Sequence, residues 1–183
     1  SSAELYKIDS LIGHTYWSSS TLESLLPDAT DFFSSSNVVI NENEIIFSAG
    51  PSFFSFNFHT GTINWNKELN SVGTPIIDGK NIFFVTSNGY LIIMDKDVGE
   101  IISSTNILKI LKKKKRKTKI TGFIMGSGKI YSVTMNGYLI VSSAVSGKVE
   151  YFKKIGDPVT SPPVISGGSL YLLTKNYRLI GFN

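Results

Sequence analysis

Runs of β-branched, aromatic and aliphatic residues, interrupted by short polar turns, cover most of the chain. One eight-residue stretch, VTSNGYLI at 85–92, returns as VTMNGYLI at 133–140 with a single change, and a looser copy occupies 173–180. In the two close copies an Asn-Gly pair separates two apolar runs, and such a pair accepts positive φ at both central positions of a type I′ turn. The pattern therefore predicts a β-hairpin around Gly89 and another around Gly137.

A second pattern accompanies these hairpins: an apolar strand, a polar turn that ends in glycine, and another strand. Its fullest form is FNFHTGTINW at 56–65. The turn glycines recur at intervals of roughly 40 to 50 residues, the length of a four-stranded propeller blade. They are Gly13, Gly61, Gly99 and Gly147. The sequence therefore predicts an all-β propeller built from four-stranded antiparallel blades.

These two patterns divide the chain into repeats. We expect one propeller domain over 1–183, with a blade remnant at 1–20, an inter-blade segment at 21–36 and blades at about 37–70, 71–106, 120–155 and 159–183. The first repeat carries two predicted strands and the last carries three. Because an unclosed ring exposes sheet edges, we expect about four blades that form half of an eight-bladed ring, in preference to a closed four-bladed ring. Self-association of two chains to complete a ring stays open.

The composition is that of a folded globular domain. Hydrophobic residues make up 42% of the 183 residues and charged residues 17%, which excludes a disordered chain. No apolar run reaches the roughly 18 residues that a membrane span needs. The chain has no cysteine, so disulfides and thiolate metal sites are excluded.

The net charge of +4 comes from one segment. Eight of the 18 basic residues lie between 109 and 119, and the rest of the chain carries 10 basic against 14 acidic residues. Such a run is normally a solvated loop, because its charges repel one another; the alternative is docking to an acidic partner or to anionic lipid headgroups. Nucleic acid is not an expected partner, because no aromatic residues interleave the run. The candidate docking residues are Lys112, Lys113, Lys114, Lys115 and Arg116.

Aromatic residues stand four positions after three of the turn glycines. They are Trp17, Trp65 and Tyr151. We expect them to fill the gaps between neighbouring blades, each burying about 150–250 Å². Stacking on a bound quinone is the less favoured alternative, because a position that recurs from repeat to repeat does not converge on one site.

The turns also hold the residues from which an active site would have to be built. Asp9, Asp95 and Asp97 precede turn glycines, where a carboxylate normally binds its own backbone. His14 and His59 flank turn glycines and are expected at the surface. No Ser-His-Asp elbow, Walker loop or dinucleotide fingerprint occurs. We therefore predict a protein that is not an enzyme, with no catalytic, cofactor-binding or metal-binding residues.

The order of these features resembles a known family. The motif hydrophobic-Asp-x-x-x-Gly-x-x-x-Trp is similar to the repeat of pyrroloquinoline-quinone-type propellers. Within that group, WNKEL at 65–69 followed by TPIIDG at 74–79 resembles the outer-membrane protein assembly factor BamB family, as does the ending from SPPV at 161–164 to LIGFN at 179–183. The resemblance covers almost the whole chain and corresponds to the C-terminal half of that eight-bladed family. The chain departs from the pattern after Gly99, where no tryptophan follows.

The resemblance implies a non-catalytic scaffold of the β-barrel assembly machinery, which supports assembly and insertion of outer-membrane β-barrel proteins. It also implies a periplasmic lipoprotein at the outer membrane. The implied partners are the periplasmic repeats of the barrel-forming subunit and nascent outer-membrane proteins. An acidic inter-blade loop contacts that subunit in the family, which points to Asp28 and Asp31 here. The alternatives are a fragment of a quinone-dependent dehydrogenase and an unrelated propeller that serves as an interaction or sensor module.

Overall fold

The computed structural model describes residues 4–21, 35–111 and 118–183. Within these residues the chain forms five antiparallel sheets and a short 3-10 helix, η2 (Ile107–Ile110). The strands are β1 (Glu4–Ile8), β2 (Thr15–Ser20), β3 (Val39–Asn41), β4 (Glu44–Ala49), β5 (Ser52–Asn57), β6 (Ile63–Lys67), β7 (Ile76–Asp78), β8 (Asn81–Val85), β9 (Tyr90–Asp95), β10 (Ile101–Asn106), β11 (Ile120–Gly126), β12 (Lys129–Thr134), β13 (Tyr138–Ser143), β14 (Val149–Lys154), β15 (Val164–Ser166), β16 (Ser169–Leu173) and β17 (Leu179–Phe182).

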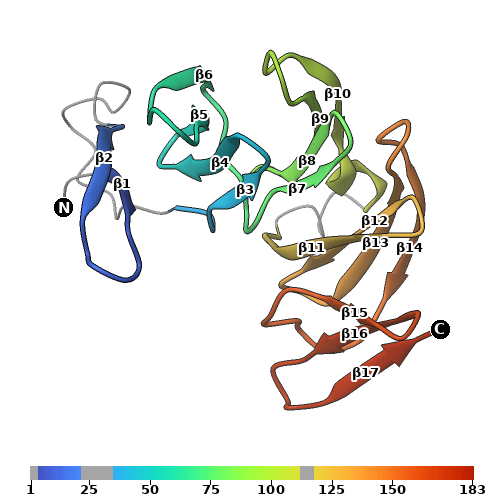
Figure 1. Cartoon of the computed structure of the whole chain (residues 1–183). Helices are drawn as coiled ribbons and strands as arrows, with labels where there is room; N and C mark the ends of the chain where they lie inside the picture. Colours follow the sequence, from blue (N-terminus) through green and yellow to red (C-terminus); the bar gives the residue numbers. More distant parts are fainter. Residues whose placement is uncertain (1–3, 22–34, 112–117) are drawn as a thin grey trace.

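Three of the sheets are complete blades of four consecutive strands, which we number first to third: β3–β6, β7–β10 and β11–β14. The two-stranded sheet β1–β2 precedes them and the three-stranded sheet β15–β17 follows them. Figure 1 shows the five sheets succeeding one another along an open curve, with these two smaller sheets at its ends. The predictions of an all-β fold and of four-stranded antiparallel blades are confirmed, and the described chain is a partial propeller.

The up-and-down course of each blade gives the curve two rims. At one rim lie the turns between first and second strands and between third and fourth strands; we call it the turn rim. At the other lie the hairpins between second and third strands, together with the connections to the next sheet; we call it the hairpin rim. Backbone hydrogen bonds hold the connections there, since Val72 N–H donates to Val85 O at 2.7 Å and Met135 N–H donates to Lys119 O at 2.9 Å.

The core of the molecule lies between the blades. Strands β5, β8 and β9 read SFFSFN, NIFFV and YLIIMD, and every interior residue of the three strands is buried. Such nearly continuous apolar runs are typical of strands that are covered on both faces. Between the first and second blades Phe53 stacks on Phe84, with ring centroids 4.3 Å apart. The outer strands β10 and β14 are largely exposed, so each blade depends on its neighbours for burial.

The predicted hairpins around Gly89 and Gly137 are confirmed, because β8 pairs with β9 and β12 pairs with β13, but their turns are not of type I′. Gly89 has a φ of 78°, but Asn88 does not have positive φ. The loop is longer than two residues, because Thr86 N–H donates to Tyr90 O and Gly89 N–H donates to Thr86 O, both at 2.9 Å. In such a loop only the last residue before the second strand takes the left-handed conformation. In the last hairpin Tyr177, with a φ of 58°, occupies this position.

The hairpin glycines also allow another segment to approach the backbone. A methyl group at Gly89 would lie 2.5 Å from the side chain of Leu108 in η2. A methyl group at Gly137 would collide with the backbone carbonyl of Asp157. Each of these glycines therefore anchors the connection that leaves its own blade.

Replacing Gly89 with alanine should destabilise the fold by about 3 kcal/mol, because the left-handed conformation costs about 1–2 kcal/mol and overpacking against Leu108 adds about 1–3 kcal/mol. Gly79→Ala is the matched control. Gly79 has a φ of 59°, but a methyl group there would meet none of the described residues within 4 Å. Urea unfolding should show a loss of only about 1–2 kcal/mol for this control. Equal losses in the two variants would contradict the role of Leu108.

Candidate functional site

Two of the seams between neighbouring sheets are built around a tryptophan side chain that packs on a turn glycine. The Trp17 ring lies against Gly61, where a methyl group would be 2.5 Å from it, and the Trp17 indole N–H donates to Phe58 O at 3.1 Å. Trp65 repeats this arrangement in the next seam. Its ring would lie 2.6 Å from a methyl group at Gly99, and its indole N–H donates to a backbone carbonyl of the same turn at 2.9 Å. Both tryptophans therefore lie between neighbouring sheets.

The two residues at the equivalent positions of the next repeats, Ser103 and Tyr151, do not pack in this way. Ser103 takes the tryptophan slot between the second and third blades, where its hydroxyl lies 2.9 Å from the place of a methyl group on Gly147 and donates to Ser146 O at 3.3 Å. Tyr151 is 53% exposed and lines an open groove of about 400 Å³ between the third blade and the sheet β15–β17. In the part of the chain that the structure describes, Tyr151 therefore does not fill the gap between these two sheets, as its repeat position would lead one to expect. A methyl group placed on Gly13 would likewise meet none of the described residues within 4 Å.

The turn carboxylates accept hydrogen bonds from their own backbone, and the turn histidines lie at the surface. The Asp9 carboxylate accepts hydrogen bonds from the N–H groups of Leu11 and Ile12, and Asp95 does the same two and three residues further along its own turn. His14 and His59 are both exposed. Among the residues that the structure describes, no group of three or more His, Asp or Glu side chains is placed to hold a metal ion.

A buried lysine crosses the same seam as Trp65. Lys96, whose side chain is 11% exposed, belongs to the second blade, and its ammonium lies 3.4 Å from Glu44 Oε2 and 3.9 Å from Glu42 Oε2 of the first blade. Asp97 Oδ1 lies 3.6 Å away. Burial raises the pKa of Glu44 above its ordinary value, and Lys96 opposes that rise. Burial lowers the pKa of Lys96, whereas the surrounding carboxylates, Glu44 first among them, raise it by more than burial lowers it. The pKa of Lys96 is therefore higher than its ordinary value.

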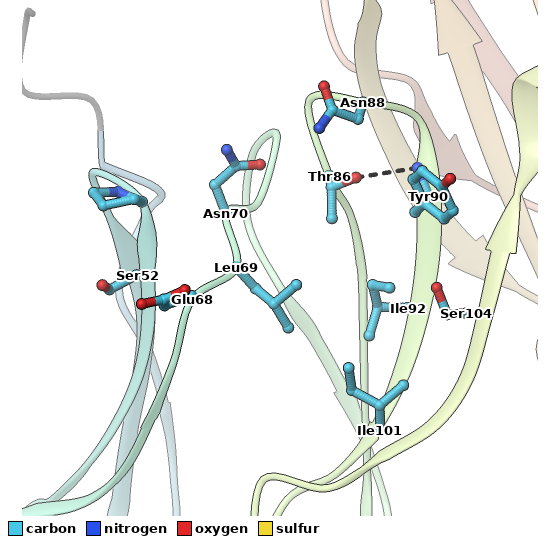
Figure 2. Close-up of a pocket in the computed structure, with 11 residues that line it drawn as sticks. Ser52, Glu68, Leu69, Asn70, Thr86, Asn88, Tyr90, Ile92, Ile101 and Ser104 are labelled. Atoms are coloured by element: carbon cyan, nitrogen blue, oxygen red, sulfur yellow. Dashed lines mark hydrogen bonds between the residues drawn. The ribbon is translucent and has the colours of Figure 1, made fainter.

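A groove of about 520 Å³ lies between the first and second blades and extends from the hairpin rim along β9 and β10. Figure 2 shows Ser52, Glu68 and Asn70 on one side of this space, with Asn88 and Ser104 across from them. Its volume falls within the range of about 300–1,000 Å³ that is usual for ligand sites. The lining residues are Pro51, Ser52, Glu68, Leu69, Asn70, Thr86, Asn88, Tyr90, Ile92, Ile101 and Ser104.

The groove combines an apolar wall with carboxamides at its upper end. Ile92 and Ile101 contribute apolar surface from the second blade, and Leu69 contributes it from the connection (Figure 2). The Asn70 side-chain oxygen accepts a hydrogen bond from Ser87 N–H at 3.0 Å, which orients its amide group. Glu68 is the one charged side chain among the lining residues. This arrangement suits the binding of a polypeptide segment, with an apolar side chain of the segment against the isoleucines and its backbone against the carboxamides.

The predicted contact residues Asp28 and Asp31, and the basic residues Lys112, Lys113, Lys114, Lys115 and Arg116, lie outside the described residues. The described residues that follow each of these segments lie beside hairpins of the hairpin rim. Ser36 N–H donates to Ser48 O at 2.9 Å, and Lys119 O accepts from Met135 N–H at 2.9 Å.

The consecutive four-stranded sheets, the aromatic–glycine seams and the groove at a rim define a β-propeller with a surface suited to protein interaction. A family model described as "Outer membrane protein assembly factor BamB" matches residues 1–105 and 111–183. The chain belongs to this family. No curated protein sequence matches the chain.

Solved structures share the fold at low sequence identity. The crystal structure of BamB from Moraxella catarrhalis is 14% identical with a TM-score of 0.73, and covers 99% of this chain and 52% of its own. Sqt1 of Saccharomyces cerevisiae is 14% identical with a TM-score of 0.70, covering 97% of this chain and 51% of its own. The computationally designed Ika4 protein is 10% identical with a TM-score of 0.65, covering 81% and 90%. The chain thus spans about half the length of the BamB structure. Among the described residues, no helix is long and apolar enough to cross a membrane.

Two features of the site were missed by sequence reasoning. The groove joins residues of two blades, and its lining positions are ordinary strand and turn residues in the repeat pattern. The ion pairs of Lys96 join residues far apart in the chain, and Lys96 itself stands in a turn between two aspartates that suggest a solvated surface. The one available signal is that a lysine interrupts the acidic turn at the position next to Asp95.

Truncation of Trp65 to alanine should destabilise the fold by about 3–5 kcal/mol, because it opens a cavity in a seam where the side chain is 8% exposed. Tyr151→Ala, at the equivalent repeat position but half exposed, should cost less than about 1 kcal/mol. Thermal and urea unfolding of the two variants provide the measurement. If Tyr151→Ala lowered the free energy of unfolding as much as Trp65→Ala, packing of the side chain on the next sheet would not be the cause of the destabilisation.

Lys96→Met should destabilise the fold at pH 7 by about 1–3 kcal/mol, because Glu44, whose side chain is only 16% exposed, loses its counter-charge. The pKa of Glu44 then rises further, since Lys96 holds it down. A carboxyl group with a raised folded-state pKa contributes stability below its unfolded-state value of 4.5, and this contribution is lost as the pH rises through the folded-state pKa. The deficit of the variant relative to the unmodified protein should therefore grow between about pH 4.5 and pH 7.

Urea unfolding at the two pH values measures this deficit. Lys80→Met, an exposed lysine on the same rim, is the control and should change stability by less than about 0.5 kcal/mol. A deficit for Lys96→Met that shrinks as the pH rises would rule out an unpaired Glu44 as its cause.

Proposed function

We propose that this protein is a non-catalytic scaffold of the β-barrel assembly machinery, which supports assembly and insertion of outer-membrane β-barrel proteins. The proposal combines membership of the BamB family with one observation on this chain. That observation is the groove between the first and second blades, which offers apolar surface and hydrogen-bonding carboxamides with a single charged group. Such a surface, apolar with a few hydrogen-bonding groups, suits the binding of a polypeptide segment.

The mechanism that we propose is binding by a rigid rim. An aliphatic or aromatic side chain of the partner enters between Leu69 and Ile92, and the amide groups of Asn70 and Asn88 bind the partner's backbone. Because the seam beneath the groove is packed through Trp65, the two walls keep their spacing when the partner binds. Anchors of this kind, in a desolvated pocket, normally contribute most of the affinity of an interface.

Strand addition is a second contact mode within the same proposal. The outer strands β6, β10 and β14 each have one sheet neighbour in the described chain, so one edge of each strand has unpaired backbone groups. An extended segment pairs with such an edge through main-chain hydrogen bonds. This mode suits nascent outer-membrane strands, whereas the groove suits a folded partner domain.

The partner that we propose for the groove is the set of periplasmic repeats of the barrel-forming subunit, in a periplasmic location at the outer membrane. Asp28 and Asp31, and the basic residues from Lys112 to Arg116, remain proposed contacts in the same surface. The support for them is that the described residues following both segments lie at the hairpin rim, where the groove also begins.

Ser104→Arg should weaken binding to the purified periplasmic repeats by about tenfold or more, because it places a long charged side chain inside the groove. Val145→Arg is the control: Val145 is 90% exposed and lies on the turn rim. Titration calorimetry with both variants and the unmodified protein gives the affinities. Failure of the unmodified protein to bind the repeats would refute the proposed partner. Equal loss in both variants would refute the groove as the contact.

A further inference from the structure

The two rims of the curve carry opposite charge. Each charged residue of the described chain lies nearer to one rim than to the other. The turn rim holds eight acidic and five basic residues, a net charge of −3. The hairpin rim holds three acidic and seven basic residues, a net charge of +4. The molecule is therefore electrically polarised from one rim to the other.

The lysines of the turn rim are partly neutralised by neighbours. Lys96 has three carboxylates within 4 Å, and Lys129 lies 3.0 Å from Glu150. On the hairpin rim, Arg178 pairs with Asp157 at 3.3 Å. By contrast, Lys119, Lys154 and Lys175 are exposed, and no described carboxylate forms an ion pair with them. Their charge is available to a partner.

We propose that this part of the hairpin rim binds an anionic phospholipid surface. The three lysines belong to separate segments of neighbouring sheets: one precedes β11, one ends β14 and one lies in the β16–β17 hairpin. Charges spread in this way match a laterally continuous layer of headgroups better than a single acidic side chain or short peptide. Exposed Ile110, Met135 and Tyr177 lie on the same rim and supply apolar groups that can enter a membrane interface.

Membrane binding at this place does not compete with the groove. The groove lies between the first and second blades, whereas the three lysines lie on the third blade and the sheet that follows it, further along the curve in Figure 1. The inference therefore goes beyond the proposed partner and stands independently of it.

The test compares two triple variants with the same change in charge. Lys119, Lys154 and Lys175 are replaced by glutamine in one protein, and Lys80, Lys129 and Lys148 of the turn rim are replaced by glutamine in the other. Flotation with phosphatidylcholine vesicles, with and without phosphatidylglycerol, measures binding, and thermal unfolding checks that both variants are folded.

We expect the unmodified protein to bind only vesicles that contain phosphatidylglycerol, more weakly as the salt concentration rises. The hairpin-rim variant should bind about tenfold more weakly or worse, since each basic residue near an anionic surface contributes about fivefold. The turn-rim variant should change by less than about twofold. Equal losses in the two variants, equal binding to neutral vesicles, or binding to soluble polyglutamate without binding to vesicles would overturn the proposal. The last outcome would assign the rim to an acidic protein instead.

Discussion

Docking of an aromatic side chain on the turn glycine of the next blade is the contact on which the rest of this structure depends. A four-stranded sheet such as β7–β10 has two apolar faces and cannot bury either of them alone. Trp65 covers one of those faces, and it can approach because Gly99 has no side chain. The indole N–H bond to the backbone of the same turn sets the angle between the sheets. Docking of this kind occurs in two successive seams, and Ser103 takes the place of the tryptophan in the third.

The seams also determine where the molecule can bind. Trp65, Gly99 and the ion pairs of Lys96 close the seam between the first and second blades near the turn rim, whereas the groove lies in the same seam and reaches the hairpin rim. A partner at the groove meets walls whose positions are already set by packing, so little conformational entropy is lost on binding. The placement of charge adds a direction, because the hairpin rim is basic and the turn rim is acidic.

Most of the fold could be predicted because it is written in local patterns. The repeated turn glycines and the apolar runs around Gly89 and Gly137 indicate four-stranded blades directly from the chain. The turn type at Asn88 could not be predicted, because the dipeptide is the same in a two-residue and a longer loop, and only the pairing of Thr86 with Tyr90 distinguishes them. The exposure of Tyr151 depends on what lies beyond its own blade, which the repeat position does not encode.

The groove could not be predicted at all, because Glu68 and Ser104 become neighbours only when two blades are set side by side. Hydrogen–deuterium exchange of the chain, with and without the periplasmic repeats of the barrel-forming subunit, would show whether the groove is the contact. We predict added protection in 68–70 and 86–90, on both walls of the groove at the hairpin rim. Protection confined to the turns at 95–100 and 143–148, on the opposite rim, would contradict it.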